Sequence, residues 1–199
     1  MKSANQDLKK QKLHRCNKKK SMDRKEKQME RKFGIFEHFE ELNRAAAAQK
    51  KEGDKEALIA LAMENGLEKE DAEDYWETED EDWGLCNATM AALGKLKLEE
   101  QELKLQSQMK DWKDFVTQMV LEDETGDLAR AVFSPKKELA EVLAAGLKTA
   151  SRNRITVDKR IIKKAGLPES AAYIGMCGRD ELRGIITRYY LEDGKGAEA

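Results

Sequence analysis

Cysteine, proline and histidine are scarce in this sequence, and their scarcity removes several classes of protein from consideration. The 199 residues include three cysteines, two prolines and two histidines. Cys16, Cys86 and Cys177 are odd in number, far apart and in no C-x-x-C pair, so neither a disulfide framework nor a zinc site is expected. We therefore expect reduced thiols and no metal or other cofactor.

Long apolar runs are missing as well. No segment reaches the roughly 18 apolar residues that a membrane-spanning helix needs, and the N-terminus lacks the apolar centre of a secretory signal. These absences predict a cytoplasmic protein without a membrane partner. Hydrophobic residues make up 40% of the chain and charged residues 38%. With so little proline, this balance favours an all-α, multi-helix body with narrow apolar stripes and at most one very short strand pair.

Motifs of nucleotide binding and nucleophilic catalysis do not occur in the sequence. There is no G-x-S-x-G, no P-loop, no G-x-G-x-x-G after a strand and no H-E-x-x-H. A histidine-based triad would have to use His38, since His14 lies in a lysine-rich segment. We expect no enzymatic activity.

Charge is divided into blocks along the chain. Residues 1–32 carry thirteen Lys/Arg against four Asp/Glu, residues 33–133 eleven against twenty-six, and residues 134–188 twelve against six. The net charges of the blocks are therefore +9, −15 and +6, although the whole chain carries only −2. Such asymmetry indicates charged macromolecular partners and is silent about the fold.

The predicted domains follow these blocks: a basic arm (1–32), an acidic helical domain (33–133), a basic C-terminal helical unit (134–191) and a disordered tail (192–199). The basic arm has no Gly or Pro, and its apolar residues are too sparse to hold a helix by packing. It is either helical or disordered, and either a solvated tail or a segment that orders on phosphates or on an acidic protein. Its candidate contacts to nucleic acid are Lys18, Lys19, Lys20 and Arg24.

Hydrophobic periodicity and capping residues predict a series of helices. Asp54 is expected to cap the second helix, and Ser134 followed by Pro135 is expected to start another. Residues 98–109 could extend the preceding helix or form a separate one, and only residues 155–157 resemble a strand. The predicted helices are 36–51, 55–65, 69–77, 85–98, 111–122, 128–133, 134–151, 159–165 and 180–191.

The stretch from Glu68 to Trp83 is strongly acidic, with ten carboxylates and one lysine at positions 68–82. Its first half suits the N-terminal end of a helix. Carboxylates from Glu77 onward lie at or beyond the C-terminal end, where the helix dipole disfavours them, so the second half is predicted to be a loop.

This stretch could be an ordinary solvated surface. It could instead occupy a basic groove of a protein partner, with Tyr75, Trp76 and Trp83 as desolvated anchors, because aromatic residues are frequent in binding hot spots. We call the candidate partner-binding residues the acidic belt: Glu73, Asp74, Trp76, Glu77, Glu79, Asp80, Glu81, Asp82 and Trp83.

The C-terminal unit has the outline of a helix-turn-helix, although the connection from Gly166 to Gly178 is much longer than that motif allows. It could equally be a small helical cap with a basic surface, and Leu147 is expected on the buried side of helix 134–151. If the unit binds nucleic acid, its cations would contact phosphates and set position rather than sequence. The candidate cations are Arg152, Arg154, Lys159, Arg160, Lys163, Lys164, Arg179 and Arg183.

Four segments of the chain have a distinctive sequence: GIFEHFEELNRAAAAQKKEGDKEALIALAMENGLEKEDAEDY, AALGKLKLEEQEL, DWKDFVTQM and the C-terminal DELRGIITRYYL. Through these segments, residues 33–191 resemble short accessory proteins of phages and conjugative elements of gut Firmicutes. Some small proteins of such elements are anti-CRISPR inhibitors, which bind an RNA-guided nuclease and block its capture of DNA. The resemblance implies this type of function, but it assigns no functional role to any individual residue of this chain.

The favoured hypothesis is a non-enzymatic, anti-CRISPR-like inhibitor whose acidic belt occupies the nucleic-acid channel of a Cas9-like effector. The alternative is a DNA- or RNA-binding accessory protein of the same elements, acting through the basic arm and the C-terminal helices. A third interpretation is a homo-oligomer in which the basic arm of one molecule pairs with the acidic belt of another.

Overall fold

The computed structural model of the chain describes residues 32–80, 82–168 and 172–192. The chain divides into two compact units, residues 1–36 and residues 37–199. In the first unit, Lys32 lies over the ring of Phe33, with 5.1 Å from its Nζ to the ring centroid. The described residues from Glu37 onward belong to the second unit.

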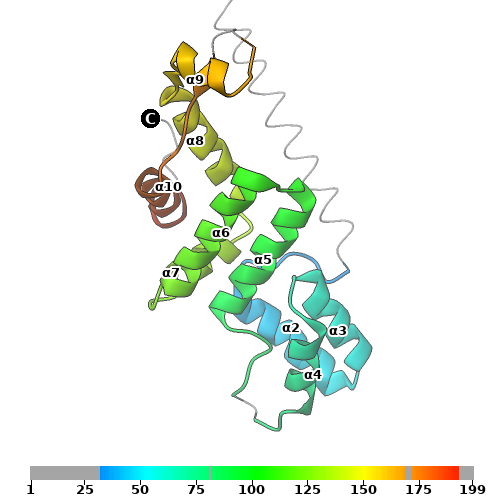
Figure 1. Cartoon of the computed structure of the whole chain (residues 1–199). Coiled ribbons are helices and arrows are strands. Elements are labelled where there is room, and N and C mark those ends of the chain that lie inside the picture. The colour runs from blue at the N-terminus through cyan, green and yellow to red at the C-terminus, as the bar shows by residue number, and fades with distance from the viewer. Residues whose placement is uncertain (1–31, 81, 169–171, 193–199) are drawn as a thin grey trace, which may run out of the picture. The chain divides into compact units, whose positions relative to one another are not determined.

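The all-α prediction is confirmed, since the described residues form helices and a single pair of two-residue strands (Figure 1). In this part of the chain no helix is both long enough and apolar enough to cross a bilayer. The elements are α2 (Phe39–Glu52), α3 (Lys55–Glu64), α4 (Lys69–Glu77), α5 (Ala88–Leu103), α6 (Ser107–Glu122), α7 (Asp127–Phe133), α8 (Leu139–Arg152), β1 (Ile155–Thr156), α9 (Lys159–Lys164), β2 (Tyr173–Ile174) and α10 (Arg179–Leu191).

Local start and stop signals set the ends of α2, α3 and α9. The Asp54 carboxylate accepts a hydrogen bond from the Ala57 amide at 2.8 Å and caps α3. The Asp158 carboxylate accepts from the Arg160 amide and caps α9. Gly53, after α2, has a left-handed φ of 77°, which glycine adopts without steric cost.

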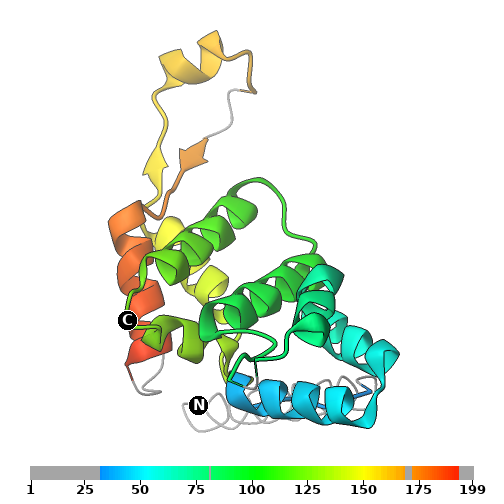
Figure 2. The same ribbon diagram turned by 90° about the horizontal axis from the view of Figure 1, so that it is seen from below.

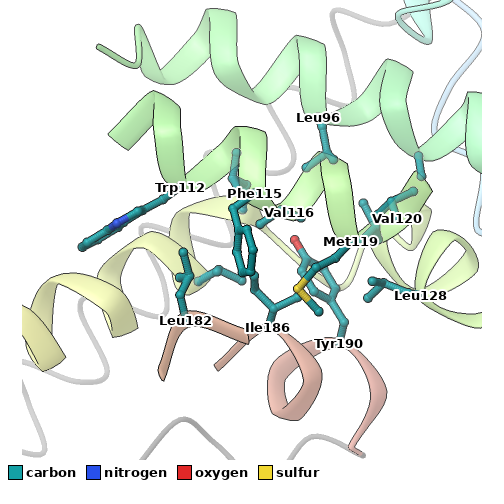
Figure 3. Packing of buried hydrophobic residues seen from close by; sticks show 14 of the residues in the cluster. Leu96, Trp112, Phe115, Val116, Met119, Val120, Leu128, Leu182, Ile186 and Tyr190 are labelled. Atoms are coloured by element: carbon teal, nitrogen blue, oxygen red, sulfur yellow. The ribbon is translucent and has the colours of Figure 1, made fainter. Parts of the chain in front are cut away.

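The largest hydrophobic cluster lies between α5, α6, α7, α8 and α10. Figure 3 shows its centre, where Leu182 and Ile186 of α10 lie beside Phe115 of α6. The cluster takes residues from both sides of the predicted domain boundary at residue 133, so one core spans the two predicted segments. The apolar stripe predicted on α6 is buried as expected: Trp112, Phe115, Val116, Met119 and Val120.

A close approach of two glycines joins α5 to the turn between α3 and α4. A Cβ added to Gly66 would lie 2.2 Å from the Gly94 carbonyl oxygen, and one added to Gly94 would lie 2.5 Å from the Asn65 carbonyl oxygen. Gly66 also has a left-handed φ of 80°. The helix penalty of Gly94, about 1 kcal/mol relative to alanine, is offset by this contact because no side chain fits there.

Residues 98–109 belong to the ends of two helices. α5 continues to Leu103, Lys104 adopts a left-handed φ of 51°, and α6 begins at Ser107. α6 therefore starts earlier than the predicted residue 111. Leucine recurs throughout this stretch among charged and amide residues, so its apolar pattern does not mark the break.

The first helix also starts later than predicted, at Phe39 instead of Phe36. His38 is extended, with φ −131° and ψ 148°. The Glu41 carboxylate accepts a hydrogen bond from the Glu37 amide at 2.8 Å. That bond holds the entering chain outside the helix.

The predicted helix start at Ser134 and Pro135 is wrong. α7 ends at Phe133 with Ser134 as its C-cap, and α8 begins at Leu139. Leu147 was expected to be buried but is 57% exposed. The neighbouring residue Gly146 is buried instead. The Trp112 ring packs against Gly146 so closely that a Cβ added there would lie 2.8 Å from the ring.

Lys95 and Glu99, one turn apart on α5, account for the α7–α8 boundary. The Glu99 carboxylate lies at the N-terminus of α8, where its oxygens accept from the Leu139 amide at 3.3 and 3.4 Å and complement the helix dipole. The Lys95 ammonium group donates to three carbonyl groups at the end of α7 and in the turn that follows, those of Val132, Ser134 and Lys137.

Burial of Glu99 makes stability depend on pH. Loss of solvent raises the pKa of Glu99, more than the charge of Lys95 lowers it. The folded-state pKa is then above the unfolded value, so the stabilisation is complete below about pH 4.3 and is lost as the pH rises through the folded pKa. When the pH is raised from 4.5 to 7, the free energy of unfolding should therefore fall less for Glu99→Gln than for the unmodified protein. Urea unfolding at each pH measures this.

The matched control is Glu56→Gln, at an exposed position on α3. It should leave the pH dependence of unfolding unchanged. A Glu99→Gln variant with the same pH dependence as the unmodified protein would contradict the predicted linkage.

Candidate interaction surfaces

The acidic belt occupies the end of α4 and the loop that follows. Glu73 and Asp74 lie on α4, and Glu77 is its last residue. Glu73 pairs with Lys69 at 2.9 Å, and the hydrogen bond from that lysine lowers the pKa of Glu73. The prediction of a loop in the second half is confirmed for the described residues after Glu77.

Lys50 of α2 holds the start of this loop. Its Nζ donates to the Tyr75 carbonyl at 2.8 Å and to the Thr78 carbonyl at 2.5 Å. It also lies over the Tyr75 ring, 4.8 Å from the centroid. A cation at the C-terminal end of α4 stabilises the helix dipole and offsets the unfavourable carboxylates there.

Asn43 of α2 holds the other end of the loop. Its Nδ2 donates to the Cys86 carbonyl at 2.8 Å, and its Oδ1 accepts from the Cys86 amide at 3.0 Å. A Cβ on Gly84 would lie 2.5 Å from Asn43 Nδ2, so the backbone passes directly over the amide. Both ends of the acidic loop are therefore fixed by one helix.

Aromatic residues of this region differ in accessibility. Tyr75 is 6% exposed and packs inward, so its predicted role as a binding anchor is wrong. Trp76 is half-buried, whereas Trp83 is 62% exposed. Trp83 is therefore the accessible aromatic side chain of the acidic belt.

Four carboxylates of the acidic belt have no cationic partner in the described part of the chain. Among the described residues, no Lys or Arg forms an ion pair with Glu77, Glu79, Asp80 or Asp82, all of which are exposed. Oδ1 of Asp80 accepts from the Asp82 amide at 3.0 Å and shapes the turn. Glu81, the remaining loop carboxylate, lies outside the described residues.

The predicted cations of the basic arm, Lys18, Lys19, Lys20 and Arg24, also lie outside the described residues. The C-terminal candidates divide into two groups. Those from Arg152 to Lys164 belong to what we call the C-terminal ribbon, residues 152–168 and 172–176. Figure 2 shows α9 lying away from the helices of the body, at the far end of the two strands.

The C-terminal ribbon is not a helix-turn-helix, because strand β2 intervenes between α9 and α10. β1 and β2 pair antiparallel, with Ile155 opposite Ile174 and Thr156 opposite Tyr173. Its base is tied to α10: Asn153 Nδ2 donates to the Glu181 carboxylate at 2.8 Å, and the other Glu181 oxygen accepts from the Gly178 amide at 2.8 Å.

The cations of the C-terminal ribbon differ in their partners. Arg160 forms a two-pronged pair with Asp158, with Nε–Oδ1 at 3.0 Å and Nη2–Oδ2 at 2.9 Å. Arg154 lies over the Tyr173 ring, 5.5 Å from its centroid. The remaining four, which are exposed and form no ion pair with any described carboxylate, are Arg152, Lys159, Lys163 and Lys164.

Arg179 and Arg183 form the second group, on α10. Both guanidinium groups lie over the ring of Phe115, at 5.5 and 5.4 Å from its centroid. These cation–π contacts give the two arginines a structural role in covering the edge of the core. Their predicted contact with phosphates stays untested.

Sequence reasoning missed Asn43 and Lys50, although both left a signal. They are seven residues apart on α2, two helical turns, and therefore lie on one face of the helix. Leu42 and Ala46 are buried beside them. Polar residues beside the buried stripe of a helix indicate hydrogen-bond partners in another segment. Here the partners are backbone carbonyl and amide groups at the two ends of the acidic loop.

Comparison with known proteins gave no match: no family model, no curated protein and no solved structure is similar to this chain. Across the described ranges, no group of three or more His, Cys, Asp or Glu is arranged to hold a metal ion.

Removing the Asn43 amide should destabilise the protein. Asn43→Ala leaves the amide and carbonyl of Cys86 without partners in a largely buried position, which costs about 1–3 kcal/mol. Urea unfolding should show this loss. Arg44→Ala is the control, since its side chain is 76% exposed on the same helix and makes only a 3.9 Å pair with Glu41. Equal stability of the two variants would contradict the role of Asn43.

Cys86 should be chemically inert while the protein is folded. Burial raises the pKa of the Cys86 thiol to about 12, and the thiolate is the reactive form. In a Cys16→Ser background at pH 8, iodoacetamide should label Cys86 in urea but not in the native protein, as read by peptide mass mapping. Equal labelling under both conditions would contradict this prediction.

Proposed function

We propose that the protein is a non-enzymatic inhibitor that binds a basic, nucleic-acid-binding surface of a partner protein through its acidic belt. The partner implied by the sequence resemblance is an RNA-guided nuclease of the Cas9 type. The observation that carries the proposal is Trp83, 62% exposed among carboxylates that have no cationic partner in the described structure.

The acidic belt combines the two features that such binding needs. Carboxylates spaced along a loop can face the lysines and arginines that line a phosphate-binding channel, and complementary charge speeds encounter. An indole that becomes desolvated on binding slows dissociation, since buried tryptophans are frequent hot spots.

Fixing of the loop supports the same proposal. Lys50 and Asn43 hold the two ends of the loop, so less conformational entropy is lost when a partner orders the residues between them. Hydrated carboxylates on an exposed loop are also poor candidates for acid–base catalysis, which uses groups in water-excluded sites.

Two variants separate charge from the aromatic anchor. The probe is a purified Cas9-type nuclease loaded with guide RNA, and the readout is association and dissociation rates together with target-DNA capture. Glu77→Gln/Glu79→Gln/Asp80→Asn/Asp82→Asn should slow association at low salt by about tenfold or more. Trp83→Ala should mainly speed dissociation, by roughly tenfold to a hundredfold.

The control variant removes the same charge at exposed positions elsewhere: Glu56→Gln, Asp111→Asn, Glu124→Gln and Glu192→Gln. It should bind as the unmodified protein does. If the nuclease captures DNA equally well with and without the protein, or if both four-site variants behave alike, the proposed function is wrong.

A further inference from the structure

The C-terminal ribbon exposes apolar surface as well as charge. Of the thirteen large apolar side chains that are exposed among the described residues, six lie within this short segment. Such a concentration marks a surface that binds another molecule. The six, with exposed fractions between 54% and 68%, are Ile155, Ile161, Leu167, Tyr173, Ile174 and Met176.

The apolar side chains are displayed by a fixed scaffold. Ile155 and Ile174 are directly opposed in the strand pair. A Cβ on Gly175 would lie 2.0 Å from the Ala150 carbonyl oxygen, so the base of the ribbon is packed against the end of α8. Asn153 ties the same base to Glu181. The exposed residues therefore project from an anchored base.

The chemistry of the surface selects its occupant. Isoleucine, leucine and methionine gain free energy only when apolar atoms cover them, and a phosphate backbone offers charge without such cover. The ammonium groups of Lys159, Lys163 and Lys164 can pair with acidic groups of a partner. The occupant is therefore a protein surface that is acidic and carries an exposed apolar side chain.

The same chain presents a surface of this kind. The acidic belt contains the exposed indole of Trp83 and four carboxylates that form no ion pair among the described residues. We infer that two copies of the protein associate reciprocally, with the C-terminal ribbon of each on the acidic belt of the other. A two-fold arrangement forms this contact twice, so modest complementarity suffices for a dimer.

Reciprocal association would cover the acidic belt, so dimer formation would compete with the partner binding proposed above. The inference uses the same loop but does not depend on what that partner is. It is tested on the purified chain alone, so the two proposals can fail separately.

The test is a charge exchange followed by light scattering. The ribbon-reversed variant is Lys159→Glu/Lys163→Glu/Lys164→Glu, and the belt-reversed variant is Glu79→Lys/Asp80→Lys/Asp82→Lys. At low salt the unmodified protein should show a concentration-dependent mass approaching twice that of the monomer. At about 1 M salt, where the Debye length is about 3 Å, it should be monomeric. Each variant alone should be monomeric at low salt, and an equimolar mixture should regain the dimer.

Two further variants sharpen the result. Ile174→Ser, which removes exposed apolar surface without changing charge, should weaken dimerisation at least about tenfold. Lys51→Glu/Lys104→Glu/Lys148→Glu reverses three exposed lysines outside the ribbon and should leave it unchanged. Circular dichroism confirms that each variant is folded.

Several outcomes would overturn the inference. They are a protein that is monomeric at every salt concentration, a dimer that survives both reversals, and a mixture of reversed variants that stays monomeric. A monomer that binds random duplex DNA, and loses that binding in the ribbon-reversed variant, would assign the ribbon to nucleic acid instead.

Discussion

The contact between Gly66 and Gly94 is the constraint on which the position of the acidic belt depends. α4 begins three residues after Gly66, so the distance between that turn and α5 determines where α4 and its loop lie. Any side chain at either glycine would force the two segments apart. Lys95 and Glu99, which follow Gly94 on α5, bind the end of α7 and the start of α8. α5 therefore contacts both the segment that leads into α4 and the junction between α7 and α8, and it fixes the positions of both.

Local signals made most of the helices predictable. Caps such as Asp54 and Asp158 act within one helical turn, and the apolar stripe of α6 is sufficient to define its buried face. The errors arose where a distant side chain overrides a local preference. Ser134 and Pro135 form a good helix start in isolation, but the three carbonyl groups bound by Lys95 keep that segment in a turn. Leu147 fits the apolar pattern of its helix, yet Trp112 occupies the space beside it at Gly146.

The sequence predicted which segments carry the charged candidate surfaces, but it predicted only in part which of their side chains are exposed. The block pattern located the acidic belt and the C-terminal cations, because a run of like charge must face solvent or a partner. Composition could not reveal that Tyr75 is buried while Trp83 is exposed, since both are aromatic residues in the same acidic stretch. It also could not separate Arg179 and Arg183, which lie on Phe115, from the exposed lysines of α9. These distinctions depend on tertiary contacts between segments far apart in the sequence.

Anchoring of the acidic loop at both ends by α2 has an evolutionary consequence. The bonds from Lys50 and Asn43 are made to backbone atoms on either side of the loop, and the described loop residues Glu79, Asp80, Asp82 and Trp83 are exposed. Substitutions between these anchor points should accumulate with little penalty to folding. The sequence of the loop can thus diverge while the helices that carry it stay the same.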